Sequence, residues 1–240
     1  MLDPTPKTAK DHPEISGGST IGIKYDKGVL LAADTHLMYA GCYWYKDAQR
    51  IHKVADNCVI ASSGDYADLQ MLLKKLKDKN DYDIIAEDGH QHYEPKDYCK
   101  WLANVHFNKR MRVDPYYNSH IVAGVDSKSG DKFLGTVDVH GNNFEGNYVL
   151  TGIANYFCNA ILDGNVTDDL TLEGARELMT KCFTVLYYKD KSQGDKIQYV
   201  TIDTDSNVNF EDPVTLESKW DYHFTKHLTN DHTRDVRFKN

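Results

Sequence analysis

The sequence of 240 residues has no long hydrophobic run and fewer basic than acidic residues, 28 against 36. No stretch approaches the ~20 apolar residues that span a bilayer, and residues 1–17 lack the apolar core of a secretory signal. The net charge is -8, and an acidic surface repels the phosphates of nucleic acids and of anionic lipids. We therefore expect a protein that binds neither a membrane nor a nucleic acid.

The sequence also lacks closely spaced cysteines. The five cysteines are odd in number, widely spaced and form no C-x-x-C pair, which excludes a zinc ribbon or redox motif at the usual spacing. We interpret them as buried or semi-buried thiols in a reducing compartment. The pairs His90–His92 and His223–His227 have ligand-compatible spacing but no cysteine partner. We interpret them as surface histidines and expect no metal and no cofactor.

The remaining composition is that of an ordinary globular protein. Hydrophobic residues make up 40% and charged residues 27%, and the length suits one large domain or at most two small ones. No internal repeat is present. We expect one domain over residues 18–222, with an irregular N-terminal arm over 1–17 and a C-terminal arm over 223–240.

Short alternating or apolar runs predict β-strands. Ser19–Tyr25 alternates, Asp26–Gly28 has turn residues, and Val29–Ala33 is apolar throughout. This pattern predicts a hairpin whose second strand is covered on both faces. Further strands are expected at Gln49–Val54, Cys58–Ser62, Ser119–Val125, Lys132–Val139, Asn143–Val149, Lys196–Asp203 and Val208–Glu211.

Four segments have the signals of amphipathic helices. A leucine stripe at helical spacing marks Leu69–Leu76, and a proline in the first turn marks a helix after Glu94. A third helix is expected over Ala154–Leu162, and a fourth after its N-cap Thr171. Strands thus alternate with helix pairs along the chain, which favours an α+β fold with helices outside two stacked sheets.

Five segments, by their order and spacing, resemble the β subunits of the proteasome core particle. The opening hairpin, the next strand and the turn into the first helix of that family are matched by Gly18–Asp34, Arg50–Val54 and Ala61–Asp68. Leu186–Asp190 and Trp220–Asp221 resemble its non-catalytic subgroup, called beta type-4 or beta-seven. The resemblance covers nearly everything from Gly18 to about Trp220.

This resemblance implies a four-layer αββα sandwich of the N-terminal nucleophile (Ntn) hydrolase type, assembled in stacked seven-membered rings. Such hydrolases use a hydroxyl on the first residue of the mature chain, and the α-amine of that residue serves as the base. A nearby lysine tunes the amine, and an aspartate orients the lysine.

The resemblance also indicates that this catalytic set is eroded. Gly18 stands at the position of the nucleophile and has no hydroxyl, whereas Asp34 matches the aspartate. Arg50 replaces the lysine, and because arginine stays protonated it cannot relay a proton. The other site positions are matched by Thr151, Asp190 and Gln193. We therefore expect no catalytic residue, and a structural subunit that supports ATP- and ubiquitin-dependent protein degradation by the complex.

Two other readings remain open. Gly18-Ser19 imitates the junction at which active precursors cut themselves, so Ser19 could be the nucleophile of an active Ser/Thr peptidase. Side chains alternate along a strand, so a shift of one residue points Ser19 away from the site unless a β-bulge restores its direction. The second is an unrelated α+β ligand-binding protein, which would be a stable monomer. Asp34 and Arg50 could also form a purely structural ion pair.

Contacts with other chains are expected at two places. The aromatic run Tyr43–Tyr45 has the residue types that interfaces favour. The resemblance implies contacts with neighbouring β subunits, with the α ring and, through the C-terminal arm, with the opposite β ring. It also implies a location in cytoplasm and nucleus.

Overall fold

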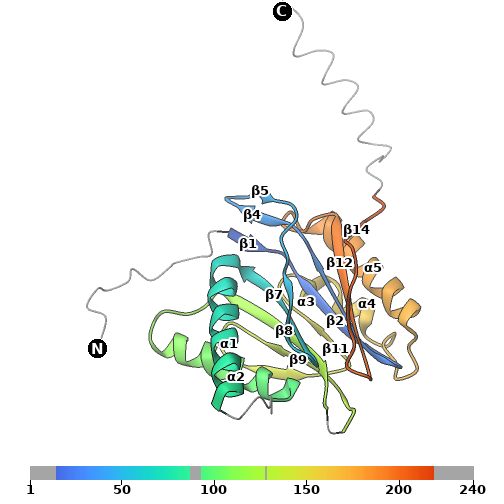
Figure 1. Ribbon diagram of the computed structural model, residues 1–240. Coiled ribbons are helices and arrows are strands. Elements are labelled where there is room, and N and C mark those ends of the chain that lie inside the picture. The colour runs from blue at the N-terminus through green and yellow to red at the C-terminus, as the bar shows by residue number, and fades with distance from the viewer. Residues whose placement is uncertain (1–14, 87–92, 128, 219–240) are drawn as a thin grey trace, which may run out of the picture.

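The computed structural model describes residues 15–86, 93–127 and 129–218. Within these ranges two antiparallel sheets stack face to face, and helices cover their outer faces (Figure 1). The strands are β1 (Ile15–Gly17), β2 (Thr20–Tyr25), β3 (Gly28–Asp34), β4 (Leu37–Tyr39), β5 (Cys42–Tyr45), β6 (Ile51–Ala55), β7 (Cys58–Asp65), β8 (Asn118–Val125), β9 (Lys132–Val137), β10 (Asn143–Glu145), β11 (Tyr148–Leu150), β12 (Lys196–Asp203), β13 (Val208–Phe210) and β14 (Val214–Thr215). The helices are α1 (Tyr66–Ala86), α2 (Pro95–Met111), α3 (Ala154–Phe157), α4 (Asn159–Leu162) and α5 (Leu172–Lys189).

The first sheet runs in the order β10-β9-β8-β7-β1-β4-β5, with β6 paired to β7, and the second in the order β11-β2-β3-β12-β13, with β14 paired to β12. Three hydrophobic clusters separate the layers. One lies between the first sheet and α1 and α2, one between the two sheets, and one between the second sheet and α3–α5. The expected α+β sandwich with outer helices is therefore confirmed.

The predicted opening hairpin is also confirmed, as β2 and β3. Every residue of β3 is buried. Leu30 and Ala32 face helices α3–α5, whereas Val29, Leu31 and Ala33 face the first sheet. Because both faces of this strand are covered, a continuous apolar run replaces the usual alternation.

Helix ends follow the capping signals in the sequence. The Thr171 hydroxyl accepts a hydrogen bond from the Gly174 N–H at 3.2 Å, which satisfies one of the free donors at the start of α5. In α2, Pro95 occupies the first turn, and Glu94 and Asp97 form a reciprocal capping box.

Several predicted boundaries were wrong. Ile15–Gly17, expected to be part of an irregular arm, form β1 between β4 and β7. The single strand expected over 143–149 is two strands in different sheets, β10 beside β9 and β11 beside β2. The third helix is divided at Cys158 into α3 and α4, although this residue keeps helical backbone angles. The hairpin of β4 and β5 was not predicted.

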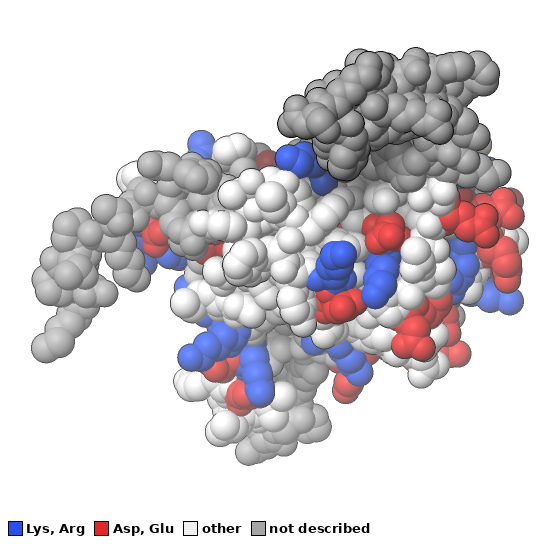
Figure 2. Space-filling model, turned by 90° about the horizontal axis from the view of Figure 1, so that it is seen from above, with Lys and Arg blue, Asp and Glu red and all other residues white. Residues whose placement is uncertain are grey.

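The outer surface has two features that bear on function. Acidic and basic side chains are interspersed on the face in Figure 2, with uncharged surface between them. On β5, Tyr43, Trp44 and Tyr45 are 46%, 67% and 55% exposed, so this run is available for contacts.

Cys42 beside them is exposed, contrary to expectation, whereas the other four cysteines are buried. In the part of the chain described, none of the helices is long and apolar enough to cross a membrane.

Candidate functional site

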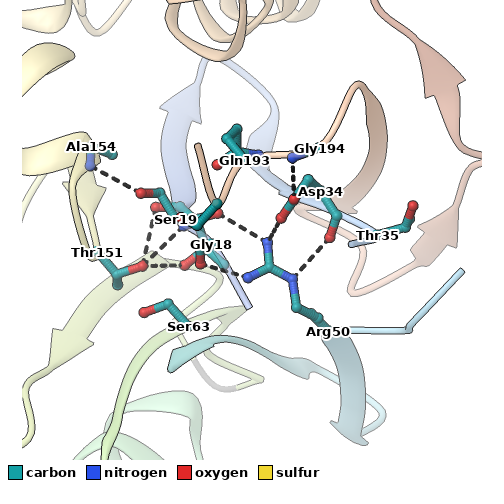
Figure 3. A network of polar contacts seen from close by, with 12 residues as sticks. Gly18, Ser19, Asp34, Thr35, Arg50, Ser63, Thr151, Ala154, Gln193 and Gly194 are labelled. Carbon is teal, nitrogen blue, oxygen red and sulfur yellow. Dashed lines mark hydrogen bonds and ion pairs between the residues drawn. The ribbon is translucent and has the colours of Figure 1, made fainter. Parts of the chain in front are cut away.

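Arg50 is the centre of a buried polar network (Figure 3). Its guanidinium forms an ion pair with the carboxylate of Asp34, at the end of β3, and both side chains are inaccessible to solvent. Other N–H groups of Arg50 donate to backbone carbonyls of Asp34 at 2.9 Å, of Gly18 at 2.5 Å and of Ser19 at 3.1 Å. One carboxylate and three carbonyls therefore satisfy the planar fork of donors.

Gly18 lies between β1 and β2, directly against this network. A Cβ at Gly18 would lie 3.0 Å from Oε1 of Gln193, 3.3 Å from the carbonyl oxygen of Ser192 and 3.5 Å from Oδ1 of Asp34. A Cβ at Gly17 would lie 2.5 Å from Cδ and Nη1 of Arg50. The Arg50 side chain thus fills the space in front of Gly17, whereas Gln193, Ser192 and Asp34 narrow the space in front of Gly18.

The loop after α5 closes the site on its other side. The N–H of Gly194 donates to Oδ2 of Asp34 at 2.7 Å, which anchors the loop to the ion pair. Asp190 accepts hydrogen bonds from the N–H and the hydroxyl of Ser192, at 2.9 and 2.8 Å, and so shapes the turn. Gln193 is fully buried, and neither polar atom of its side chain has a partner among the described residues.

Thr151 and Ser19 lie next to the start of β2, beside the ion-pair network. The Thr151 hydroxyl accepts from the N–H of Thr20 at 3.0 Å and shares a hydrogen bond with the Thr20 hydroxyl at 2.7 Å. The Ser19 hydroxyl accepts from the N–H of Ala154 at 3.0 Å, at the start of α3. In Figure 3 this hydroxyl points toward Ala154 and Thr151 and away from the Asp34–Arg50 pair.

A cleft of about 280 Å³ opens beside Gly18, and Ser19, Ser63, Asp190 and Ser192 are among its lining residues. Strand β1 also contributes to its wall through Gly17. We call this space the Gly18 cleft. Its lining holds several hydroxyl groups, so it can donate and accept hydrogen bonds.

Burial dominates the electrostatics of the ion pair. It raises the pKa of the Asp34 carboxyl, and the Arg50 guanidinium and the N–H of Gly194 oppose that rise. Burial also lowers the pKa of Arg50, against the attraction of Asp34. Because each charge offsets the desolvation of the other, the two side chains are stable in this site only together.

The arrangement is suited to holding the backbone rather than to proton transfer. Arginine only donates hydrogen bonds, and here its donors are used by carbonyls and by Asp34. Gly18 supplies no hydroxyl, and the Ser19 hydroxyl already accepts a hydrogen bond from α3. Arg50, which donates to the carbonyl oxygen of Ser19, cannot act as a base for the Ser19 hydroxyl.

The structure brings all six predicted positions to one region, in two groups. Asp34 and Arg50 form the ion pair, and Gly18 and Gln193 lie beside it. Asp190 shapes the adjacent loop. Thr151 instead bonds to Thr20. That these six positions form an eroded site without a catalytic residue remains a prediction.

Sequence reasoning missed Gly17, Ser63 and Gly194, whose contacts depend on elements far away along the chain. Only the Ser63-Gly64 pair carried a local signal, because glycine after serine marks a turn. The residues that the structure describes include no group of three or more His, Cys, Asp or Glu side chains that could hold a metal ion. The four histidines considered above as ligands lie outside those residues.

Comparison with known proteins gives the family. Residues 15–202 match a family described as proteasome subunit. The chain is 34% identical to proteasome subunit beta type-4 of Xenopus laevis over 88% of this chain and 86% of the relative. It is 32% identical to the beta type-4 subunit of Arabidopsis thaliana (88% and 84%) and 31% identical to proteasome subunit beta type-7 of Saccharomyces cerevisiae (91% and 85%). These matches confirm the resemblance and the Ntn-hydrolase fold, and the chain belongs to the proteasome β-subunit family.

Proposed function

We propose that this chain is a non-catalytic, structural subunit of the proteasome core particle. The observation that carries the proposal is the position of Arg50, which donates to the carbonyls of Gly18 and Ser19 and to Asp34. Gly18 stands at the position of the nucleophile and supplies no hydroxyl for the reaction. Arg50 stands at the position of the lysine and holds the backbone by hydrogen bonds instead of providing an amine that can titrate.

Strand β1 supports the proposal independently. It lies between β7 and β4, pairing Gly17 with Gly64 on one side and with Leu37 on the other. Cleavage before Gly18 or Ser19 would separate β1 from β2. Strand β1, which lies in the middle of the first sheet, would then have no covalent bond to the rest of the domain. While β1 remains attached, the nitrogen of Gly18 is part of a peptide bond and cannot act as a base.

The alternative is an active peptidase that uses Ser19 after cleavage at Gly18. Its side chain faces Gly152 and Ala154, and a Cβ at Gly152 would lie only 3.1 Å from the Ser19 hydroxyl. To reach Asp34 and Arg50, Ser19 would have to rotate across the opening strand. The pairing of β2 with β3 is regular from Thr20 onward, which disfavours such a change.

N-terminal sequencing and intact mass of the chain from assembled particles test the proposal. We expect an N-terminus upstream of Gly18 and no adduct with an epoxyketone probe, which needs both a hydroxyl and a free α-amine. Labelled catalytic subunits in the same particles serve as the positive control. An N-terminus at Ser19 together with a covalent adduct on that residue would establish the alternative.

We further propose that the chain completes a seven-membered β ring and contacts the α ring. Its C-terminal arm, residues 223–240, lies outside the described residues and is proposed to reach the opposite β ring. Removing the residues after Tyr222 should weaken the pairing of half-particles on native gels, without loss of β-ring neighbours. Unchanged pairing would refute this role of the arm. The location proposed is cytoplasm and nucleus, which fractionation of tagged cells tests.

A further inference from the structure

Two buried thiols touch in the cluster between the second sheet and its helices. Cys158 joins α3 to α4, Cys182 lies within α5, and both are fully buried. The Cys158 thiol donates to the backbone carbonyl of Cys182 at 3.7 Å. Each side chain shifts the pKa of the other, as expected for close neighbours in the same cluster. The two cysteines are thus brought side by side by the fold, although they belong to different helical segments.

The other three cysteines are arranged differently. Cys58 and Cys99 are buried in the cluster beneath α1 and α2, and in the described part of the chain no hydrogen bond joins their thiols. Cys42 is exposed on β5. Among the described residues, Cys158 and Cys182 are therefore neighbours joined by a thiol–carbonyl hydrogen bond, Cys58 and Cys99 are buried without such a bond, and Cys42 is exposed. The last three cysteines serve as internal controls for the first two.

We propose that Cys158 and Cys182 are a redox-active dithiol, which peroxides convert to a disulfide. The Cys158 thiolate attacks one peroxide oxygen, the O–O bond breaks, and a sulfenic acid and hydroxide result. The Cys182 thiol then attacks the sulfenic sulfur, an S–S bond forms and water leaves. In total two thiols lose two electrons and two protons, and one hydrogen peroxide becomes two water molecules.

The contact between the thiols determines which sulfur reacts first. The neighbouring Cys182 side chain lowers the pKa of the Cys158 thiol, because a hydrogen bond from Cys182 favours the thiolate. The same bond, together with burial, raises the pKa of Cys182, which remains the protonated donor. Since the thiolate is the nucleophile, Cys158 attacks the peroxide and Cys182 resolves the sulfenic acid.

The helices around Cys158 provide a route for the oxidant. α3 and α4 have four residues each, and helices this short have little stability of their own. Tyr156 on α3 is 84% exposed, so little packing holds the outer side of this segment. Local opening of α3 and α4 admits a small oxidant without global unfolding.

A disulfide here would also reach the Gly18 cleft. Ile153, directly before α3, lines that cleft, and the N–H of Ala154 holds the Ser19 hydroxyl. Tying the α3–α4 segment to α5 would therefore restrict one wall of the cleft. The dithiol itself does not depend on whether the chain is catalytic, so the proposed function and this proposal stand or fall separately.

The experiment treats the full chain in its native assembly with hydrogen peroxide, alkylates the remaining thiols under denaturing conditions and maps the peptides by mass spectrometry. We expect a linked peptide containing Cys158 and Cys182, lighter than the two separate peptides by two hydrogen atoms. A thiol reductant should reverse the link. Cys58 and Cys99 should still be alkylated at doses that link the first pair.

Single variants test the order of the steps. In Cys182→Ser, Cys158 should accumulate as a sulfenic acid that a dimedone-type reagent traps, whereas Cys158→Ser should yield no trapped product at Cys182. Cys99→Ser, in the other buried pair, should leave the link unchanged. The wild-type map is decisive even where a variant fails to assemble. Persistence of both free thiols, or linkage of Cys58 and Cys99 at the same dose, would overturn the proposal.

Discussion

The charged side chain of Arg50 is buried, with only 1% exposed, and the Asp34 side chain beside it is not exposed at all. Such burial is stable because the guanidinium is paired and its other donors reach carbonyl oxygens. A glycine at position 17 leaves room for the long side chain. The network therefore joins the link between β1 and β2, the end of β3 and the residue directly before β6.

Replacing Arg50 by methionine should strongly destabilise the chain. Arg50→Met leaves the Asp34 carboxylate buried without a cationic partner, and breaking a buried ion pair costs about 3–5 kcal/mol. Chemical denaturation measures the loss in the free energy of unfolding. In the double variant Arg50→Met/Asp34→Asn the buried charge is removed too, so part of the stability should return. A double variant that loses the sum of both single effects would contradict this explanation.

Acid should weaken the core through two buried histidines. The Ser62 hydroxyl is 2.6 Å from Nδ1 of His120, and Nε2 of His120 is 3.0 Å from Nε2 of His106. Burial lowers the pKa of His106 from 6.5 to about 4 and also lowers the pKa of His120. Below pH 6.5 the unfolded chain therefore binds more protons than the folded chain, and stability falls as the pH falls toward 4.

The size of this effect is about 1 kcal/mol at pH 5.5 from His106 alone. Thermal unfolding at pH 7.5, 6.5 and 5.5 should show a midpoint that drops mainly across the last interval. His140→Gln, at a surface turn, serves as the control and should leave the slope unchanged. A midpoint that is flat over this range would show that the two histidines already bind protons in the folded core.

At the scale of elements, β1 is the least predictable strand and one of the most consequential. It has three residues, and each is only partly buried. Its neighbours β4 and β7 hold it through backbone pairing. The hairpin of β4 and β5 connects to the rest of the first sheet through β1, so this short strand positions the exposed aromatic run.

A side chain at Gly17 should disturb both β1 and the buried network. In Gly17→Ala the new Cβ would lie 2.5 Å from atoms of Arg50, a contact that forces the arginine to move. We expect a loss of about 1–3 kcal/mol, as for other overpacked sites, measured by chemical denaturation. Ser16→Ala in the same strand should change stability by no more than about 0.5 kcal/mol. Equal effects of both variants would exclude the clash as the cause.

Local rules accounted well for elements whose own residues decide them. The apolar run of β3, the N-cap Thr171 and the proline of α2 each placed an element close to where the structure has it. The short strands β1, β4 and β5 were not predicted, because pairing with one another and with β7 defines them rather than a pattern of their own. Residues 143–149 show the same limit, since the choice between two sheets depends on what lies beside each segment.

At the scale of the whole molecule, we propose that the exposed aromatic run on β5, Tyr43–Tyr45, is a site where another chain binds. Trp44 is the most exposed of its three aromatic residues, and it packs edge-on against Tyr39. Large aromatic side chains at this exposure are costly to solvate and are typical of interface centres. The face in Figure 2 mixes both charge signs, so charge of one sign does not determine the contacts there.

Truncation of Trp44 should weaken assembly more than folding. We expect Trp44→Ala to lower incorporation of the chain into core particles several-fold, since loss of an interface centre residue costs about 2 kcal/mol or more. Co-expression followed by native gels measures this, and thermal unfolding of the chain reports on folding. Tyr82→Ala removes an aromatic residue that is 71% exposed on α1 and serves as the control. Equal incorporation of the two variants would remove β5 from the interface.

The sequence by itself determined the family, the layered fold and the glycine at position 18, because strand and helix periods and the order of motifs are written along the chain. Only the tertiary structure decided how Arg50 is used. Its partners are Gly18 and Ser19, in the link between β1 and β2, and Asp34, at the end of β3. No local pattern in the sequence shows that the donors of Arg50 point at their carbonyl and carboxylate oxygens. The contact between Cys158 and Cys182 likewise exists because folding packs α3 and α4 against α5, which brings together residues that are distant along the chain.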